Sequence, residues 1–331
     1  MKILHVLLCR GPFPAFKFGG TERVVWSLAT AQKQQGHEVK FLMRPHDIRP
    51  EGTLLYDKRK SFNQQITDWP DVVHFHCAFT GELDKPFVCT EHANADKAKQ
   101  YDRNTIFISQ RHANNHHSDC YVYNVLDWSE YGQPSFESNS NYVHFLGKAT
   151  VRHKNMTGAA KIAKKAGHKL AVLGGKRFEF GKKGYFNLDM NIDFKGMVGG
   201  DDKFTIIKQS QALLFPVRWH EPFGLAITES LFLGTPVIGT PFGSLPEIIT
   251  QPEMGLLTTD YNEMVDALKH LDRFDRKVCH QVARDVFNAD VMAQQYQAMY
   301  GKVLNGEYLN QAAPYATQSL LDLLPVTELM S

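Results

Sequence analysis

The feature that most constrains the fold is an alternation of short apolar runs with helical patterns, which occurs twice along the chain. The first series opens with an apolar run at residues 3–8, continues with a helical pattern at 21–35, and returns to an apolar run at 39–42. Short apolar runs separated by helices are typical of parallel strands that are buried between helical layers. The sequence therefore predicts an α/β fold with doubly wound sheets.

The remaining elements follow from the same pattern. Thr21 is the expected N-cap of the first helix, and Gly36 is expected to end that helix. A polar segment at residues 129–141 separates the two series. We therefore predict a first domain at residues 1–141, a second at 142–305 and a tail at 306–331. Further strands are predicted at residues 71–76, 86–90, 105–108, 121–123, 142–146, 169–173, 192–194, 212–215 and 236–239, and a helical region at 262–304.

Composition excludes several classes of protein. With 331 residues, a net charge of +2 and 43% hydrophobic residues, the chain is long enough for two cores and is not disordered or uniformly basic. The five cysteines are scattered, without a C-x-x-C pair, which favours reduced thiols in the cytoplasm. The apolar run at residues 3–8 is shorter than a signal peptide or a membrane span. We therefore expect a cytoplasmic protein, with peripheral contact at the inner face of the membrane left open.

The most informative segment runs from Arg218 to Ser230 and contains Glu221 and Glu229. If a helix begins near Gly224, Glu229 lies roughly 7 Å along its axis, while Glu221 stays in the loop before it. Carboxylates suit the vicinal hydroxyls of sugars, and backbone amides at a helix start attract phosphate. Those amides belong to Phe223, Gly224 and Leu225. The alternative is that one glutamate caps the helix while the other is solvated.

This segment resembles the E-x7-E signature of the retaining glycosyltransferases of family 4. The resemblance covers most of the chain and implies the GT-B fold, in which two Rossmann-like domains face a central cleft. It also implies that a nucleotide-sugar binds in the cleft, with Glu221 at the sugar and Glu229 at the ribose.

Two further segments resemble phosphate-binding parts of the same family. The loop at Gly19 and Gly20 is similar to the family's glycine loop, where backbone approaches pyrophosphate; a tight strand-to-helix turn is the alternative. Lys148 and Lys154 resemble the cationic pair that neutralises the leaving diphosphate. Lys148 stands where arginine is usual, so bidentate contact is lost. Asn155 stands where glycine is usual.

Three other positions carry weaker resemblances. His92, in Thr-Glu-His after a strand, is similar to a family histidine near the reaction centre, although a lone loop histidine is more often structural. Gly196 and Met197 resemble a loop whose backbone meets the nucleotide base. Asn124 resembles a turn residue of the family, and we assign it no catalytic role.

Two rival interpretations concern metal and nucleic acid. His74, His76, Cys77 and His92 raise a metal site, but no fourth ligand has characteristic spacing, so we predict no metal and no cofactor. Residues 148–183 hold eleven Lys and Arg against one acid. This basic segment either extends the phosphate site, attracts an anionic membrane or is a solvated helix face. It lacks the interleaved aromatic residues of a nucleic-acid platform, so we expect no nucleic acid partner.

The resemblance implies a retaining hexosyltransferase that moves a sugar from a nucleotide-diphosphate sugar, with a UDP-sugar favoured, to an acceptor hydroxyl. His92, Lys148, Lys154 and Glu221 are its expected catalytic residues. The acceptor is expected to be a glycan or a lipid-linked acceptor in surface polysaccharide or lipopolysaccharide synthesis. The alternatives are an epimerase, a phosphorylase or a catalytically silent sugar-nucleotide-binding protein. The base, the sugar, the acceptor and the oligomeric state remain open.

Overall fold

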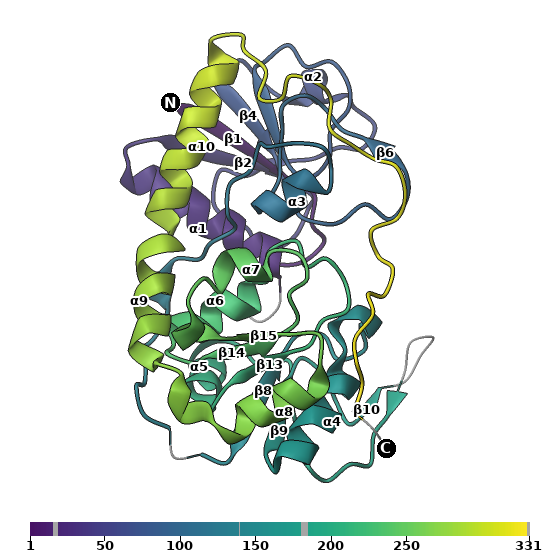
Figure 1. The fold of residues 1–331 in the computed structure, drawn as a ribbon. Coiled ribbons are helices and arrows are strands. Elements are labelled where there is room, and N and C mark those ends of the chain that lie inside the picture. The colour runs from purple at the N-terminus through teal and green to yellow at the C-terminus, as the bar shows by residue number, and fades with distance from the viewer. Residues whose placement is uncertain (16–18, 139, 180–184, 330–331) are drawn as a thin grey trace. The chain divides into compact units, whose positions relative to one another are not determined.

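The structure is a computed structural model, and it describes residues 1–15, 19–138, 140–179 and 185–329. Within these residues the chain forms two compact units. The first contains residues 1–127 and 287–320, and the second contains residues 128–286 and 321–331. Figure 1 colours the chain by residue number, so the segments of each unit can be followed.

The first unit is built on a parallel sheet with strand order β3-β2-β1-β4-β5-β7 among the described residues. Strand β1 lies inside this sheet, between β2 and β4, and residues 3–7 of it are buried. This confirms the α/β prediction for the first series of apolar runs. The strands of this sheet are β1 (Lys2–Leu7), β2 (Glu38–Met43), β3 (Leu54–Leu55), β4 (Val72–Phe75), β5 (Phe87–Thr90) and β7 (Thr105–Ile106).

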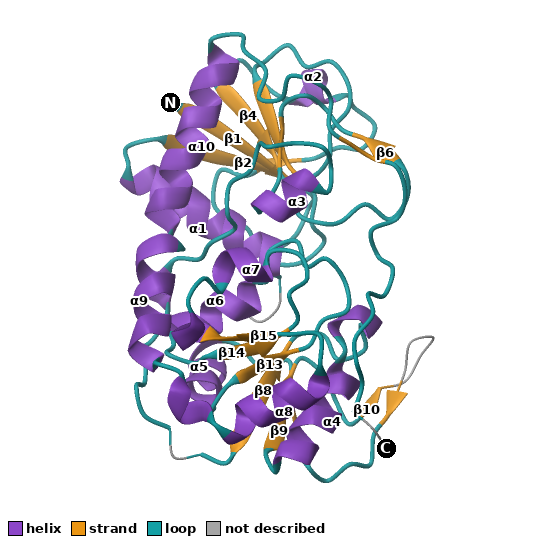
Figure 2. Cartoon of the chain, viewed as in Figure 1, coloured by secondary structure: helices purple, strands orange, loops and turns teal. Residues whose placement is uncertain are grey.

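Helices pack beside this sheet, as Figure 2 shows by colour. Helix α1 covers Gly20–Gln34 and packs against α10, which covers Ala289–Leu304. The expected N-cap of α1 was wrong: Gly19 occupies that position, with φ 137°, and among the described residues no side chain caps the helix. The shorter helices of this unit are α2 (Phe62–Gln65) and α3 (Gln110–Asn114), and its antiparallel pair is β6 (Lys99–Gln100) with β16 (Tyr315–Ala316).

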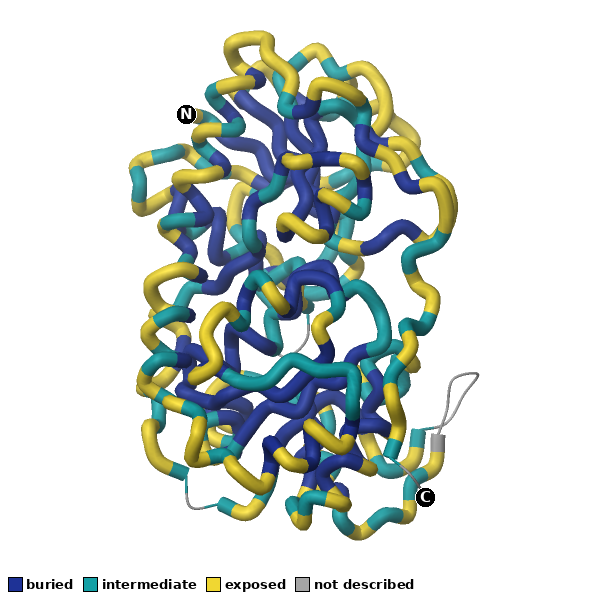
Figure 3. The backbone as a smooth tube through the Cα atoms, viewed as in Figure 1, coloured by how far each residue is buried: buried dark blue, intermediate teal, exposed yellow. Residues whose placement is uncertain are grey.

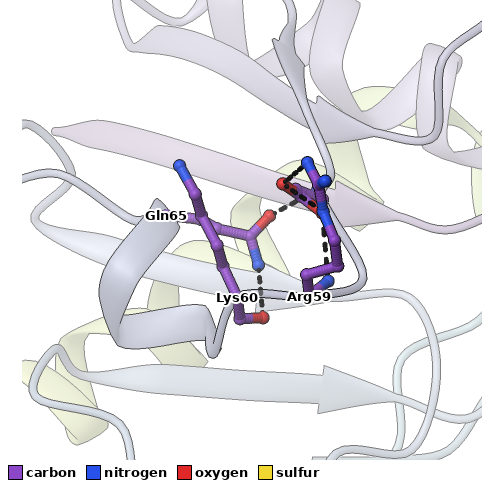
Figure 4. A network of polar contacts seen from close by, with 4 residues as sticks. Arg59, Lys60 and Gln65 are labelled. Atoms are coloured by element: carbon purple, nitrogen blue, oxygen red, sulfur yellow. Dashed lines mark hydrogen bonds and ion pairs between the residues drawn. The ribbon is translucent and has the colours of Figure 1, made fainter.

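A surface loop before α2 is held by polar contacts, which Figure 4 shows. The Arg59 guanidinium donates to the Asp57 carboxylate, with Nε 2.9 Å from Oδ1. The Gln65 amide closes the loop from the other side, because it accepts from the Asp57 backbone at 2.7 Å and donates to the Lys60 carbonyl at 3.0 Å. Exposed contacts of this kind order a loop locally and add little to global stability.

The second unit repeats the plan, with a parallel sheet of order β12-β9-β8-β13-β14-β15. Its elements confirm the second series of apolar runs. The strands are β8 (Tyr142–Leu146), β9 (Lys169–Leu173), β12 (Ile192–Gly196), β13 (Leu213–Phe215), β14 (Val237–Gly239) and β15 (Gly255–Leu257), with an antiparallel pair β10 (Phe178–Glu179) and β11 (Tyr185–Phe186). The helices are α4 (Met156–Ala166), α5 (Gly200–Gln209), α6 (Leu225–Phe232), α7 (Leu245–Ile248), α8 (Tyr261–Lys269) and α9 (Arg276–Val286). Short 3₁₀ turns are η1 (Trp128–Glu130), η2 (Arg152–Lys154), η3 (Pro252–Met254) and η4 (Leu271–Arg273).

Two predicted elements differ from the structure. The expected strand at residues 121–123 is reduced to a single bridge between Tyr121 and Phe107. The helical region predicted at 262–304 is three helices, α8, α9 and α10, of which α8 and α9 belong to the second unit and α10 to the first.

The structure also divides the chain at other residues than the sequence suggested. The expected boundary lay at residue 141, whereas the second unit begins at Trp128. The Trp128 ring stacks on Phe232 of α6 with centroids 4.3 Å apart, and the Tyr131 hydroxyl donates to Glu229 on the same helix. Trp128 and Tyr131 therefore pack against α6, so the beginning of the polar segment belongs to the second unit.

The return of the chain to the first unit is made by α10. Tyr296 and Tyr300 of this helix are buried, and their hydroxyls hydrogen-bond to Thr90 and His74 of the first sheet. The tail expected at residues 306–331 is divided, with residues up to 320 in the first unit and the rest in the second.

Each unit has its own apolar core, and Figure 3 colours the buried residues dark blue. In the first sheet, Leu4, Val73 and Phe75 belong to one buried cluster. In the second, Val143, Leu170 and the side chains of α4 and α8 form another. No helix in the described residues combines the length and the apolar character that a bilayer crossing needs.

Parallel sheets of this order place ligands at a defined edge. Strand order reverses direction beside β1 in the first sheet and beside β8 in the second. Ligands of such sheets bind at the carboxyl ends of the strands near this reversal. The loops that follow β1, β4 and β5 in one unit, and β8 and β13 in the other, are therefore where a site is expected.

Candidate active site

Glu221 lies in the loop between β13 and α6, and its backbone is fixed by Gly243. The two residues form a parallel bridge, and the Ser244 amide donates to the Glu221 carbonyl at 3.0 Å. A Cβ atom added to Gly243 would lie 2.2 Å from the Glu221 carbonyl oxygen. Gly243 also has φ +69°, a conformation that favours glycine. The backbone that carries the Glu221 carboxylate is therefore held in one position.

Glu221 is 6% exposed, and its carboxylate accepts two hydrogen bonds. Lys154 Nζ lies 2.6 Å from Oε2, and the Trp219 indole donates to the same oxygen at 2.7 Å. Lys154 is the last residue of η2, in the loop that follows β8. The structure therefore brings together two residues for which the resemblance implied different parts of the donor, Lys154 at the diphosphate and Glu221 at the sugar.

Asn155, which stands where the family has glycine, explains how Lys154 is aimed. Its backbone is left-handed, with φ 59° and ψ 47°, a conformation that asparagine tolerates better than most residues. Its side chain accepts from the Gly158 amide at 3.2 Å and donates to the Pro216 carbonyl at 2.7 Å. Asn155 thus keeps the turn that glycine would allow and ties it to the loop after β13.

Helix α6 begins directly after this glutamate. Gly224 has φ 87° and is the N-cap, and among the described residues no side chain caps α6. Phe223 is buried, while Leu225 is partly exposed. The positive end of the helix dipole therefore lies beside Glu221, whose Cγ is 3.3 Å from a Cβ built on Gly224, and this end attracts anions.

Glu229 is not the solvated helix residue of the alternative interpretation. It is 4% exposed, and its Oε1 pairs with Lys203 Nζ of α5 and accepts from the Tyr131 hydroxyl. Lys203 is 5% exposed. A buried charge is tolerated only when it is paired, and Lys203 supplies that pairing for Glu229 in the interior of the second unit.

The strand ends that precede Lys148 and Met197 lie side by side at one edge of the second sheet. A Cβ on Gly174, at the end of β9, would lie 2.3 Å from the Gly147 carbonyl oxygen. The Gly174 amide donates to the Gly196 carbonyl at 2.8 Å. Lys148 is exposed and Met197 is 42% exposed. The ends of β8, β9 and β12 thus lie side by side, with Lys148 and Met197 next to them in the chain.

In the first unit, Gly19 and Gly20 form the turn from β1 into α1. Gly19 has φ 137°, and a Cβ there would lie 2.8 Å from Glu22 Oε2 and 2.9 Å from Ala15 Cβ. The glycine is therefore required by the local packing. The connection between β1, which ends at Leu7, and α1, which begins at Gly20, is longer than the tight turn given as the alternative. Gly20 is exposed at the first position of α1. Phe18, which belongs to the same motif, lies outside the described residues.

His92 follows β5 and is partly exposed. Its Nε2 lies 3.3 Å from His76 Nδ1, and its Nδ1 lies 3.3 Å from the Asn124 amide nitrogen. Burial lowers the pKa of His92 to about 4. The ring is therefore neutral at pH 7 and joined to the interior of the first unit.

Of the possible metal ligands that the sequence suggested, only His74 and His76 belong to a compact group among the described residues. The compact set is His5, His74 and His76, whose ligand atoms lie within 4.8 Å of one another. Both ring nitrogens of each histidine already bond to protein groups, in contacts of 2.7–3.3 Å. A metal ion would have to displace those contacts, so the geometry favours a hydrogen-bonded network.

The basic segment at residues 148–183 contains several contacts with acids of the second unit. Lys161 pairs with Glu328 at 3.2 Å and Lys164 pairs with Asp189 at 3.2 Å, and both lysines are more than half exposed. These lysines therefore belong to a solvated face of α4. Lys182 and Lys183 lie outside the described residues.

Sequence reasoning missed three partners of the predicted site residues. Trp219 stood inside the quoted segment, and its indole is a donor that a buried carboxylate requires. Lys203 lies among the acids of the first turn of α5, where a lysine is normally exposed. Tyr131 lies in the segment interpreted as a linker. Only Trp219 carried a local signal, because the other two meet Glu229 through tertiary packing.

Known proteins are similar to parts of this chain in sequence. Residues 140–272 match the family model of glycosyl transferases group 1, a range that contains Lys148, Lys154, Glu221 and Glu229. An uncharacterized 41.2 kDa protein from the cps region of Klebsiella pneumoniae is 29% identical over 116 residues. That match covers 33% of this chain and 32% of the relative, so the chain spans about a third of the length of this relative.

Solved structures are similar over almost the whole chain. The glycosyltransferase AviGT4, involved in avilamycin A biosynthesis, has a TM-score of 0.71 at 20% identity, covering 92% of this chain and 98% of its own. HepE from Anabaena, solved in complex with UDP-glucose, has a TM-score of 0.66 at 14% identity, covering 91% and 99%. At these identities the likeness shows the fold. The chain therefore has the GT-B fold of glycosyltransferases, and its residues 140–272 match the group 1 glycosyl transferase family.

Proposed function

We propose that this protein is a retaining hexosyltransferase that moves a sugar from a nucleotide-diphosphate sugar, with a UDP-sugar favoured, to an acceptor hydroxyl. The acceptor class we favour is a glycan or glycolipid of surface polysaccharide, because a relative lies in a cps region. A UDP-sugar is favoured because HepE, which has the same fold, was solved with UDP-glucose.

The observation that carries this proposal is the pairing of Lys154 with Glu221 beside the start of α6. The ammonium and the carboxylate are 2.6 Å apart, and the helix N-terminus begins three residues after the glutamate. A cation next to a helix N-terminus suits a diphosphate, and a carboxylate beside it suits the hydroxyls of the attached sugar. One short loop thus offers groups for both halves of the donor.

The chemical task that we assign to these groups is stabilisation of the leaving diphosphate. As the bond between the sugar and the diphosphate breaks, negative charge grows on the phosphate oxygens. Lys154, Lys148 and the amides of Gly224 and Leu225 are positioned donors for such charge. We assign the base contact to Gly196 and Met197.

Neither glutamate is proposed as a nucleophile. Glu221 accepts from Lys154 and Trp219, and we assign its carboxylate the part of a hydrogen-bond acceptor for sugar hydroxyls. Glu229 is assigned to the ribose, with Lys203 holding its carboxylate in place. The departing phosphate then takes the proton of the acceptor hydroxyl on the same face of the sugar, so that the anomeric configuration is retained.

Donor binding is the first test. Thermal unfolding of the wild type is measured with UDP, GDP, ADP and their common sugar conjugates, and compared with Lys154→Met and with the exposed helix variant Lys165→Met. At one hundred times Kd, the preferred nucleotide should stabilise the folded state by about 2.7 kcal/mol. We expect this shift to be lost in Lys154→Met and kept in Lys165→Met.

Two results would contradict the proposal. The absence of any shift in the folded wild type would remove the donor site, and an equal loss in both lysine variants would show that Lys154 has no special part in it. Product analysis then separates the alternatives. An epimerase converts the donor without an acceptor, a phosphorylase requires free phosphate, and a silent binding protein consumes no donor.

A further inference from the structure

The histidine predicted near the reaction centre is the outer end of a hydrogen-bonded chain inside the first unit. His92 Nε2 lies 3.3 Å from His76 Nδ1, and His76 Nε2 lies 2.9 Å from His5 Nδ1. His5 Nε2 then lies 2.8 Å from Gln32 Oε1. One imidazole inside β1 and two that follow β4 and β5 are thus connected in series to an amide of α1.

The chain continues beyond Gln32 into the returning helix α10. The Gln32 amide nitrogen donates to the Tyr300 hydroxyl at 3.1 Å, and that hydroxyl lies 2.7 Å from His74 Nδ1. His74 Nε2 in turn lies 2.7 Å from the Thr90 hydroxyl. The Gln32 amide thus lies between two parts of this series, with its oxygen toward His5 and its nitrogen toward Tyr300.

The orientation of one amide fixes every proton in the series. A neutral imidazole has one N–H donor and one acceptor nitrogen. Because Gln32 Oε1 only accepts, His5 carries its proton on Nε2 and accepts at Nδ1. His76 must then donate through Nε2 and accept at Nδ1, and His92 must donate through Nε2. At the far end, the Asn124 amide nitrogen faces His92 Nδ1 at 3.3 Å, which requires the same assignment.

Burial supports the neutrality on which this argument depends. His5 is fully buried and His76 is 7% exposed. Burial lowers the pKa of His5 to about 4 and the pKa of His76 well below its ordinary value. With two protons on any ring, two N–H groups would point at each other, so the series admits one proton for each imidazole.

We infer that His76, His5 and Gln32 are positioning residues that fix the tautomer of His92, with its proton on Nε2 and its Nδ1 left as an acceptor. The part that this tautomer plays in sugar transfer rests on the proposed function. His92 Nδ1 is an acceptor whose present partner is the Asn124 amide, so a ligand group that replaces the amide must be a donor such as a hydroxyl. The Nδ1 atom of His92 then accepts a hydrogen bond from a hydroxyl and carries no proton that could pass to the leaving phosphate.

The inference can be tested without any substrate. Long-range ¹H–¹⁵N spectra of protein labelled in its histidines report which ring nitrogen carries the proton, and a His92→Gln variant identifies the signals of His92. In the wild type at pH 7 we expect a protonated Nε2 and an unprotonated Nδ1. A protonated Nδ1 at His92, or an imidazolium, would overturn the inference.

Two variants of Gln32 test the relay. Gln32→Leu removes the acceptor of His5, so we expect His92 to become a mixture of tautomers. Gln32→Glu keeps an oxygen acceptor for His5 whether or not it is ionised, so we expect the wild-type tautomer. The control is His116→Phe, a buried ring of the same unit that stacks on Phe107 and lies outside the series. An unchanged His92 in folded Gln32→Leu would refute the relay, and a change in His116→Phe of the same size would do so as well.

Activity provides a second measurement. Gln32→Leu should lower kcat about tenfold, through misorientation of His92, with little change in the donor KM, and Gln32→Glu should restore it. If the wild type transfers no sugar, the proposed function fails while the tautomer of His92 is still decided by the spectra. If Gln32→Leu loses the tautomer and keeps kcat, the positioning role in transfer is refuted.

Discussion

The buried histidines of the first sheet predict that the first unit loses stability on mild acidification. Burial lowers the pKa of His5 from 6.5 to about 4, and that of His92 likewise to about 4. Between these pH values the unfolded chain binds a proton at each histidine that the folded chain does not bind. Stability is therefore complete above pH 6.5 and falls as the pH drops toward 4.

The size of the loss follows from the pKa values. A pH of 5 lies about 1.5 units below the pKa of a histidine in the unfolded chain. The folded state therefore loses about 2 kcal/mol of stability for each of His5 and His92. The two together remove about 4 kcal/mol from a folding free energy that is typically about 5–15 kcal/mol. His74 and His76, whose pKa values are also lowered by burial, act in the same direction.

Hydrogen exchange measures this loss for each unit separately. Peptides from β1 and β4 are followed between pH 7 and pH 5, with rates corrected for the intrinsic effect of pH. Those from β8 serve as the comparison, because that strand carries one buried histidine, His144, whose pKa is lowered to about 3, whereas His5, His74, His76 and His92 all act on the first unit. We expect the β1 and β4 peptides to lose more protection than β8. Equal protection of β1 at pH 7 and pH 5 would refute the reasoning.

Variants sharpen the same experiment. His5→Phe removes one titrating ring, so the loss between pH 7 and pH 5 should shrink by about 2 kcal/mol. His270→Gln changes a histidine whose side chain is 60% exposed, and the loss should stay as in the wild type.

Three further predictions concern stability. Gly243→Ala places a Cβ 2.2 Å from the Glu221 carbonyl oxygen, so urea unfolding should show a loss of at least about 2 kcal/mol, and a smaller loss than 1 kcal/mol would contradict the close approach. Gly301→Ala, in α10 with nothing within 4 Å of the new atom, should gain about 0.4–1 kcal/mol, and a destabilised variant would show that this helix face is packed. Lys203→Met leaves the Glu229 carboxylate buried without its cation and should cost about 3–5 kcal/mol, while adding Glu229→Gln should recover part of that cost; additive losses in the double variant would refute the pairing.

Much of the fold could be predicted because it depends on local patterns. The buried strands are continuous apolar runs, so residues 142–146 and 169–173 were located with the bounds that the structure gives to β8 and β9. The start of α6 after Gly224 followed from the glycine and the apolar helix behind it. The cap of α1 failed because Gly19 is demanded by a close approach to Glu22 and Ala15, which no local rule contains.

What could not be predicted depends on contacts between distant segments. The boundary at Trp128 is set by stacking on Phe232, and the return of α10 is set by Tyr296 and Tyr300 bonding to the first sheet. In the site, no local pattern indicates that Lys203 pairs with Glu229, because the two residues lie on different helices. The hydrogen bonds that connect His92 to His76, His5 and Gln32 could not be predicted either, because these residues are distant in the sequence.

The central claim is transfer of a sugar with retention at a site that includes Lys154 and Glu221. The measurement that tests it most directly is ¹H NMR of the product formed from an α-linked UDP-sugar with a panel of glycan and lipid-linked acceptors, for the wild type, Lys154→Met and Lys165→Met. The account predicts a product with an α-anomeric linkage from the wild type and from Lys165→Met, and little or none from Lys154→Met. A β-linked product, or full activity in Lys154→Met, would contradict it.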